Sequence, residues 1–117
     1  MKRLLLATVA ASSPVSAADR VPTAALSPAA ERDVQCVTLA LVAVSAEKDQ
    51  TKQQAVIAEA WYFLGRLDSD APGADLKQAT AKAFETMKGN PHTKDIGVAC
   101  DAEFEKRGAD LTKLGSQ

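Results

Sequence analysis

Two widely separated cysteines constrain the fold of this chain more than any other feature. Cys36 and Cys100 are the only cysteines among its 117 residues. In an oxidising compartment, an even number of cysteines in a small domain predicts a disulfide. Closing so long a loop contributes about 4 kcal/mol in the chain-entropy treatment, a large share of the stability of a small domain. The interpretation of the pair therefore depends on the compartment in which the chain folds.

The N-terminus predicts export to an oxidising compartment. A positive n-region, a short apolar h-region and a small-residue c-region follow one another: Lys2 and Arg3, residues 4–11 (LLLATVAA), and residues 12–17 (SSPVSA). We expect residues 1–17 to be a signal peptide, cleaved after Ala17 or Ala18, and the product to be periplasmic or secreted. An apolar stretch this short cannot provide the roughly 20 residues that span a bilayer, so no stable membrane span is expected.

Composition excludes several classes of function. The full chain has 14 basic and 15 acidic residues, so losing Lys2 and Arg3 with the leader leaves 12 basic residues and a net charge of −3. Without a dense basic block, no nucleic-acid partner is expected. His92 is the single histidine, and together with two cysteines it does not complete a zinc site. Residues 68–73 (DSDAPG) imitate part of a calcium loop, but Pro72 and Ala79 stand where oxygen ligands are required. No metal and no cofactor are expected.

Hydrophobic periodicity predicts four helices and no sheet. The first is expected to begin at the Ser27 cap with Pro28 in its first turn, and the second to begin with a Thr51–Gln54 capping box. The expected helices cover residues 27–48, residue 51 to the turn at 68–73, residues 75–88 and residues 93–115. We therefore predict an all-α fold, with residues 18–26 as a flexible lead-in. Residues 27–117 would form a single compact bundle of about four helices, with a disulfide between the first and last.

The first helix is unusually apolar. Residues 37–46 (VTLALVAVSA) are apolar on nearly every side, which is typical of a helix that is centrally buried or covered by a partner. A protein partner or a homodimer formed through this helix is therefore a candidate interaction. In the last helix the apolar residues share one face, which we expect to be core: Ile96, Cys100, Phe104, Leu111 and Leu114.

The only tryptophan and tyrosine are adjacent, in the segment Trp61–Asp68 (WYFLGRLD). Helical spacing predicts that Trp61, Phe63 and Leu64 are core residues. Tyr62 and Arg66, one turn apart, would form an exposed pair suited to a partner or ligand. Trp61, Tyr62 and Arg66 are the candidate binding residues, and Gly65 is expected to permit close approach of another helix.

No catalytic residues are predicted. The chain lacks a Gly-x-Ser-x-Gly elbow, its cysteines are expected to be oxidised, and His92 is expected in an exposed loop. Asp101, Glu103 and Glu105 are spaced like a solvated helix face.

Three segments carry a resemblance to known proteins: Arg32–Cys36 (RDVQC), Tyr62–Asp68 (YFLGRLD), and Cys100 followed by Gly108. Over most of its mature length the chain resembles small exported proteins of uncharacterised function from sphingomonad-type alphaproteobacteria. That resemblance implies no activity. In plan alone, the chain also resembles the periplasmic acid-stress chaperones, although it has a more apolar first helix and few groups that could act as an acid trigger.

Three functional hypotheses follow. The leading one is a non-catalytic exported protein that binds a partner or a small apolar ligand. The first alternative is a periplasmic acid or stress chaperone, opened by protonation of its carboxylates. The second alternative is a small hydrolase-like enzyme.

Overall fold

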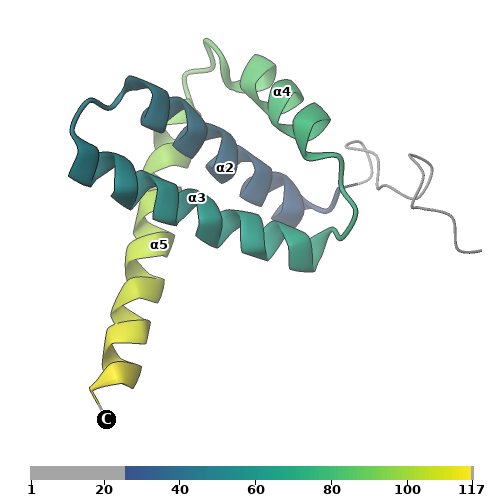
Figure 1. The fold of residues 1–117 in the computed structure, drawn as a ribbon. Helices are drawn as coiled ribbons and strands as arrows, with labels where there is room; N and C mark the ends of the chain where they lie inside the picture. Colours follow the sequence, from purple (N-terminus) through teal and green to yellow (C-terminus); the bar gives the residue numbers. More distant parts are fainter. Residues whose placement is uncertain (1–25, 117) are drawn as a thin grey trace, which may run out of the picture.

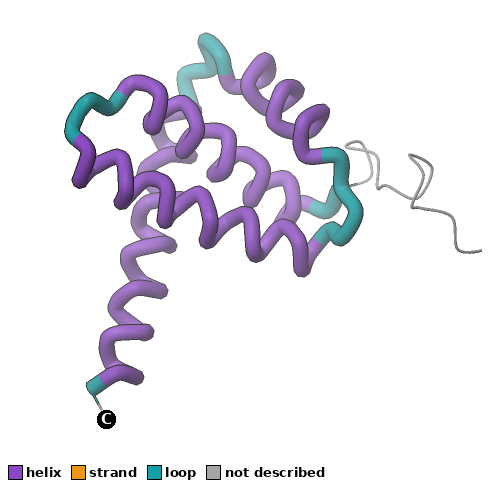
Figure 2. The backbone as a smooth tube through the Cα atoms, viewed as in Figure 1, coloured by secondary structure: helices purple, strands orange, loops and turns teal. Residues whose placement is uncertain are grey.

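The computed structural model describes residues 26–116, which form four helices joined by short turns and contain no strand (Figures 1 and 2). The helices are α2 (Pro28–Ala46), α3 (Gln50–Asp70), α4 (Leu76–Met87) and α5 (Thr93–Gly115). The all-α prediction is therefore confirmed. The expected signal peptide and residues 18–25 of the expected lead-in lie outside the described residues.

Polar side chains cap three of these helices. Ser27, Asp49 and Asp75 each accept a hydrogen bond from the backbone N–H three residues later, at 3.0 to 3.1 Å. This satisfies one of the N–H groups that a helix start leaves unpaired. The predicted Thr51–Gln54 capping box is wrong, because the Asp49 carboxylate caps α3 two residues earlier.

Helix α2 is the central element. It contacts each of the other three helices, whereas α4 packs mainly on α2. In Figure 1, α3 runs beside α2, α4 lies on the opposite side of α2, and α5 crosses behind the pair. The fold therefore depends on α2 more than on any other helix.

The core consists of two clusters along α2. The first joins α2 to the end of α3 and to α4: Ala30, Val34, Leu67, Ala71 and Ala79, with Leu26 packed against it. The second joins α2 to α3 and α5: Cys36, Val37, Phe63 and Cys100. Phe63 is fully buried, as predicted.

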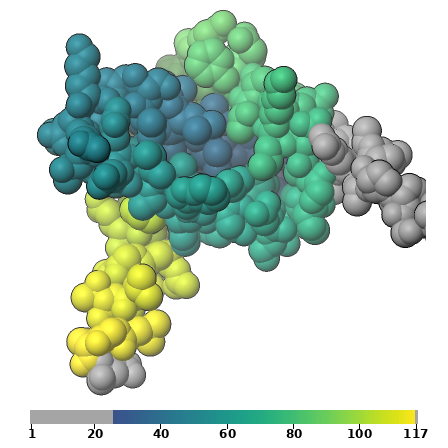
Figure 3. All heavy atoms as spheres, viewed as in Figure 1, coloured from purple at the N-terminus to yellow at the C-terminus, as the bar shows by residue number. Residues whose placement is uncertain are grey.

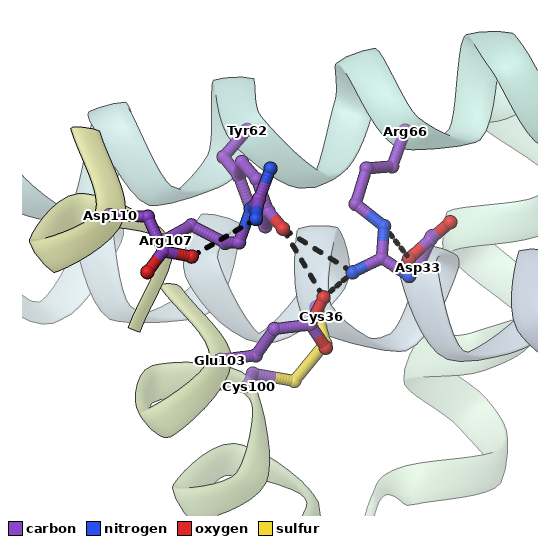
Figure 4. Close-up of polar contacts among 8 residues, drawn as sticks. All are labelled: Asp33, Cys36, Tyr62, Arg66, Cys100, Glu103, Arg107 and Asp110. Atoms are coloured by element: carbon purple, nitrogen blue, oxygen red, sulfur yellow. Dashed lines mark hydrogen bonds and ion pairs between the residues drawn. A yellow bond between two sulfur atoms is a disulfide. The ribbon is translucent and has the colours of Figure 1, made fainter. Parts of the chain in front are cut away.

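The Cys36–Cys100 disulfide joins α2 to α5, as predicted (Figure 4). The two Cα atoms are 5.7 Å apart, and both cysteines are buried. The bond lies inside the second core cluster, so α2 and α5 are joined at this position both by apolar packing and by the disulfide.

The predicted core face of α5 is wrong in its second half. Leu111 and Leu114 are 69% and 66% exposed, and Figure 1 shows this end of α5 projecting beyond the other helices. The apolar spacing is present, but no described helix lies beside it.

Two further expectations are corrected. Helix α2 is buried only through its first half, because Leu41 is 51% exposed. Gly65 does not permit close approach of another helix, since a Cβ atom built there would meet nothing within 4 Å. No helix within residues 26–116 is both long enough and apolar enough to cross a bilayer.

Candidate functional site

An apolar groove runs over the C-terminal half of α2, between α3 and α4. Figure 3 shows this region as a hollow between the teal side chains of α3 and the green side chains of α4. Its volume is about 420 Å³, within the range of roughly 300–1,000 Å³ that is typical of small-molecule sites. We call it the α2–α4 groove, and its lining residues are Val37, Leu41, Val44, Ile57, Ala60, Trp61, Leu64, Leu76, Lys77 and Thr80.

A second hollow of about 410 Å³ adjoins the groove between α2 and α4. It shares Leu41, Lys77 and Thr80 with the groove, so the two hollows lie next to each other along α4. Its other lining residues are Thr38, Val42, Ser45, Ala81 and Phe84. Together the two hollows could accommodate an elongated ligand.

The groove exposes large apolar side chains to solvent. Trp61 is 67% exposed, so its predicted place in the core is wrong. Trp61 lines the groove from α3, and α4 packs mainly on α2, so no helix covers this part of α3. Contiguous exposed apolar surface of this kind is typical of ligand or partner sites.

The hydroxyl groups that line the two hollows already donate to the backbone. Thr38, Ser45 and Thr80 each donate to the carbonyl oxygen four residues earlier, at 2.7, 3.0 and 2.8 Å respectively. The described lining includes no carboxylate, imidazole or thiol, and Lys77 is its one charged residue. The groove is thus chemically suited to binding and offers no acid–base pair.

Tyr62 and Arg66, predicted as an exposed pair, instead lie half-buried between α3 and α5 (Figure 4). Arg66 forms an ion pair with Glu103, and the Tyr62 hydroxyl donates to the same carboxylate at 3.3 Å. Arg66 Nη1 also donates to the Tyr62 oxygen at 3.4 Å. The expectation that Glu103 is simply solvated is therefore wrong. These residues attach α5 to α3, and the structure does not bring them together with Trp61 in the groove.

Asp33 of α2 completes this polar cluster. Its side chain is fully buried, and its Oδ1 lies 3.5 Å from Arg66 Nε. Burial, followed by the nearby Asp70 carboxyl, raises the pKa of Asp33 to about 6, and the Arg66 charge opposes this rise. Because Asp33 is buried, removing the half-buried Arg66 would leave its carboxyl without a charged partner.

A pair of carboxyl groups, Glu59 on α3 and Asp101 on α5, borders another hollow. The hollow measures about 440 Å³ and adjoins Cys100. Burial is the main cause that raises the pKa of Glu59 to about 7, with contributions from a hydrogen bond to Asp101 and from the charges of Asp101 and Glu105. Sequence spacing could not reveal this pair, because its members lie on different helices. Among residues 26–116, no cluster of three or more metal-binding side chains occurs.

The groove itself was not predicted from the sequence. The one available signal was the apolar excess of α2, which includes Leu41. Nothing in the spacing of Lys77 indicated that it lies at the same site. In comparisons with known proteins, no family model, curated protein or solved structure matches this chain.

Proposed function

We propose that this chain is a non-catalytic exported protein that binds a small apolar ligand in the α2–α4 groove. The observation that carries the proposal is the groove itself, a hollow of about 420 Å³ with an almost wholly apolar lining. Exposed apolar side chains such as Leu41 and Trp61 favour occupancy, because a ligand would remove their surface from water.

Two features support the export and the absence of catalysis. The Cys36–Cys100 disulfide is typical of proteins that fold in an oxidising compartment. The described lining offers no carboxylate, imidazole or thiol to pair with Lys77 in acid–base or nucleophilic catalysis, and its hydroxyls donate to backbone carbonyls.

Binding of a neutral apolar dye, N-phenyl-1-naphthylamine, tests the proposal. Leu41→Gln places a polar group in the lining of both hollows, so we expect it to weaken dye binding by about tenfold, the loss typical of one apolar side-chain contact. Leu111→Gln is the matched control: it alters an exposed leucine of α5 that lines none of the described hollows, so dye affinity should not change.

The measurement is dye fluorescence, together with quenching of Trp61, the single tryptophan. Equal dye affinity in both variants and the unaltered chain would contradict the proposal. If the groove instead binds a protein partner or a second copy, sedimentation of the purified chain would show a dimer that Leu41→Gln dissociates.

The acid-chaperone alternative has less support. A chaperone opened by acid requires carboxylates that stabilise the fold when they are charged. Asp33 and Glu59 have raised pKa values of about 6 and about 7, so protonating them favours the folded state. These two groups thus oppose opening at mildly acidic pH.

A further inference from the structure

Lys77 places one positive charge at the α2–α4 groove, and binding of a neutral apolar dye would not reveal its effect. Its side chain lines both hollows, and no other charged residue of the described chain lines either one. A lysine in such a position typically lays its alkyl stem along apolar surface while its ammonium group stays at the rim. An apolar trough with one cation at its edge is complementary to an amphiphile with an anionic head.

We propose that the groove binds a long-chain carboxylate, with the tail along the apolar lining and the carboxylate against the Lys77 ammonium group. This inference rests on the proposed function, because it specifies the ligand class for the same site.

Hydrogen-bonding capacity supports this ligand class. The hydroxyl protons of Thr38, Ser45 and Thr80 are already donated to backbone carbonyls. The described lining therefore keeps two side chains with donors to offer, the Lys77 ammonium and the Trp61 indole N–H. A head that only accepts hydrogen bonds, as a carboxylate does, matches this inventory, whereas a cationic head does not.

The position of Lys77 in its helix supports the same conclusion. No ion pair joins Lys77 to another residue of the described chain, and it occupies the first turn of α4. A positive charge there is unfavourable for the helix, because the N-terminus already carries a partial positive charge. Asp75, which caps the helix, accepts from the Gln78 N–H. The Asp75 carboxylate already offsets the positive end of α4, so the attraction for an anionic ligand comes from Lys77.

Three amphiphiles with the same tail and different heads test the inference: dodecanoate, dodecanol and dodecyltrimethylammonium. Titrations monitored by Trp61 fluorescence at pH 8 and below micelle-forming concentrations would give the affinities. We expect the unaltered chain to bind dodecanoate about tenfold more tightly than dodecanol, the gain typical of a charge-assisted hydrogen bond. The cationic amphiphile should bind most weakly.

Lys77→Met keeps the apolar stem and removes the charge. It should abolish the preference for dodecanoate while dodecanol binds as before. Lys82→Met, on the same helix but outside both hollows of the groove, is the matched control and should keep the preference. Circular dichroism of both variants should show the same helix content as the unaltered chain.

The outcomes separate the two proposals. Equal binding of all three amphiphiles, or a preference that survives Lys77→Met, would overturn the carboxylate inference and leave apolar-ligand binding intact. A preference for the cationic amphiphile would also overturn it. Failure of every amphiphile and of the neutral dye would refute the proposed function itself.

Discussion

Glu59 changes its charge close to neutral pH. Its pKa rises from 4.5 to about 7, mainly because of burial and then because of Asp101 and Glu105 on α5. Between these two pH values the folded chain holds more protons than the unfolded chain, so the stability of the fold decreases as pH rises. Above pH 7 the negative charges of α3 and α5 repel each other where the two helices meet.

Glu59→Gln is predicted to remove much of this pH dependence. Because the amide is neutral at every pH, the variant should gain about 1–2 kcal/mol of stability at pH 8, a value that allows for partial solvent screening. At pH 4 the gain should be close to zero. Urea denaturation at both pH values measures the difference.

Glu85→Gln provides the control for this experiment. Glu85 lies on α4, pairs with Lys88 and is mostly exposed, so its variant should keep the pH dependence of the unaltered chain. A Glu59→Gln variant with the same pH dependence as the unaltered chain would contradict the assignment of the proton to Glu59.

At the scale of elements, α5 packs least extensively on the other helices. Its first half contributes Cys100 and Ile96 to the second core cluster and Glu103 to the polar cluster. No residue of α5 lines the α2–α4 groove. Attachment of α5 and binding in the groove are therefore expected to be separable.

Replacing both cysteines should weaken the attachment of α5 without affecting binding in the groove. Cys36→Ala with Cys100→Ala is predicted to lower the free energy of unfolding by about 4 kcal/mol, because the bond closes a loop of 64 residues. Hydrogen exchange should accelerate most in α5. At temperatures where the variant is still folded, its affinity for the neutral dye should stay within about twofold of that of the unaltered chain. This corresponds to a change of under about 0.5 kcal/mol in binding free energy.

The converse result is equally informative. If the double variant loses dye binding while α2 to α4 remain protected from exchange, α5 must shape the groove at a distance, contrary to the geometry described above.

At the scale of the whole molecule, stability is unevenly distributed. Both core clusters lie along α2, whereas the projecting end of α5 exposes Leu111 and Leu114. A chain truncated after Gly108 is therefore predicted to lose less than about 1 kcal/mol of stability, as is usual for changes at exposed positions. Thermal unfolding of the truncated chain measures this loss. A decrease of more than about 2 kcal/mol in the free energy of unfolding would indicate that the projecting end is packed.

The number of helices and the disulfide were predictable because neither required knowledge of how the helices pack. Turn residues, caps and apolar spacing delimit helices, and Cys36 and Cys100 form the one possible pair. Which apolar face becomes buried was not predictable in the same way. Trp61 and Leu111 have core-like spacing, but burial requires a neighbouring helix, and the placement of α4 and α5 is a tertiary property.

The candidate site was predictable only in part. Trp61, a candidate binding residue in the sequence, lines the groove, whereas Tyr62 and Arg66 attach α5 to α3. Lys77 could not be found from the sequence, because its role arises from α4 packing on α2. Helical spacing relates residues of a single helix, whereas the groove is formed by three.

The position of the disulfide also has a consequence for the order of assembly. Synthesis delivers Cys36 to the growing chain 64 positions before Cys100, and by then α2, α3 and α4 are complete. The three helices around the groove can therefore collapse before any covalent bond is available to them. Mutations that slow their collapse would leave Cys36 reduced and accessible to other thiols, so errors in maturation should appear first as mixed disulfides at this residue.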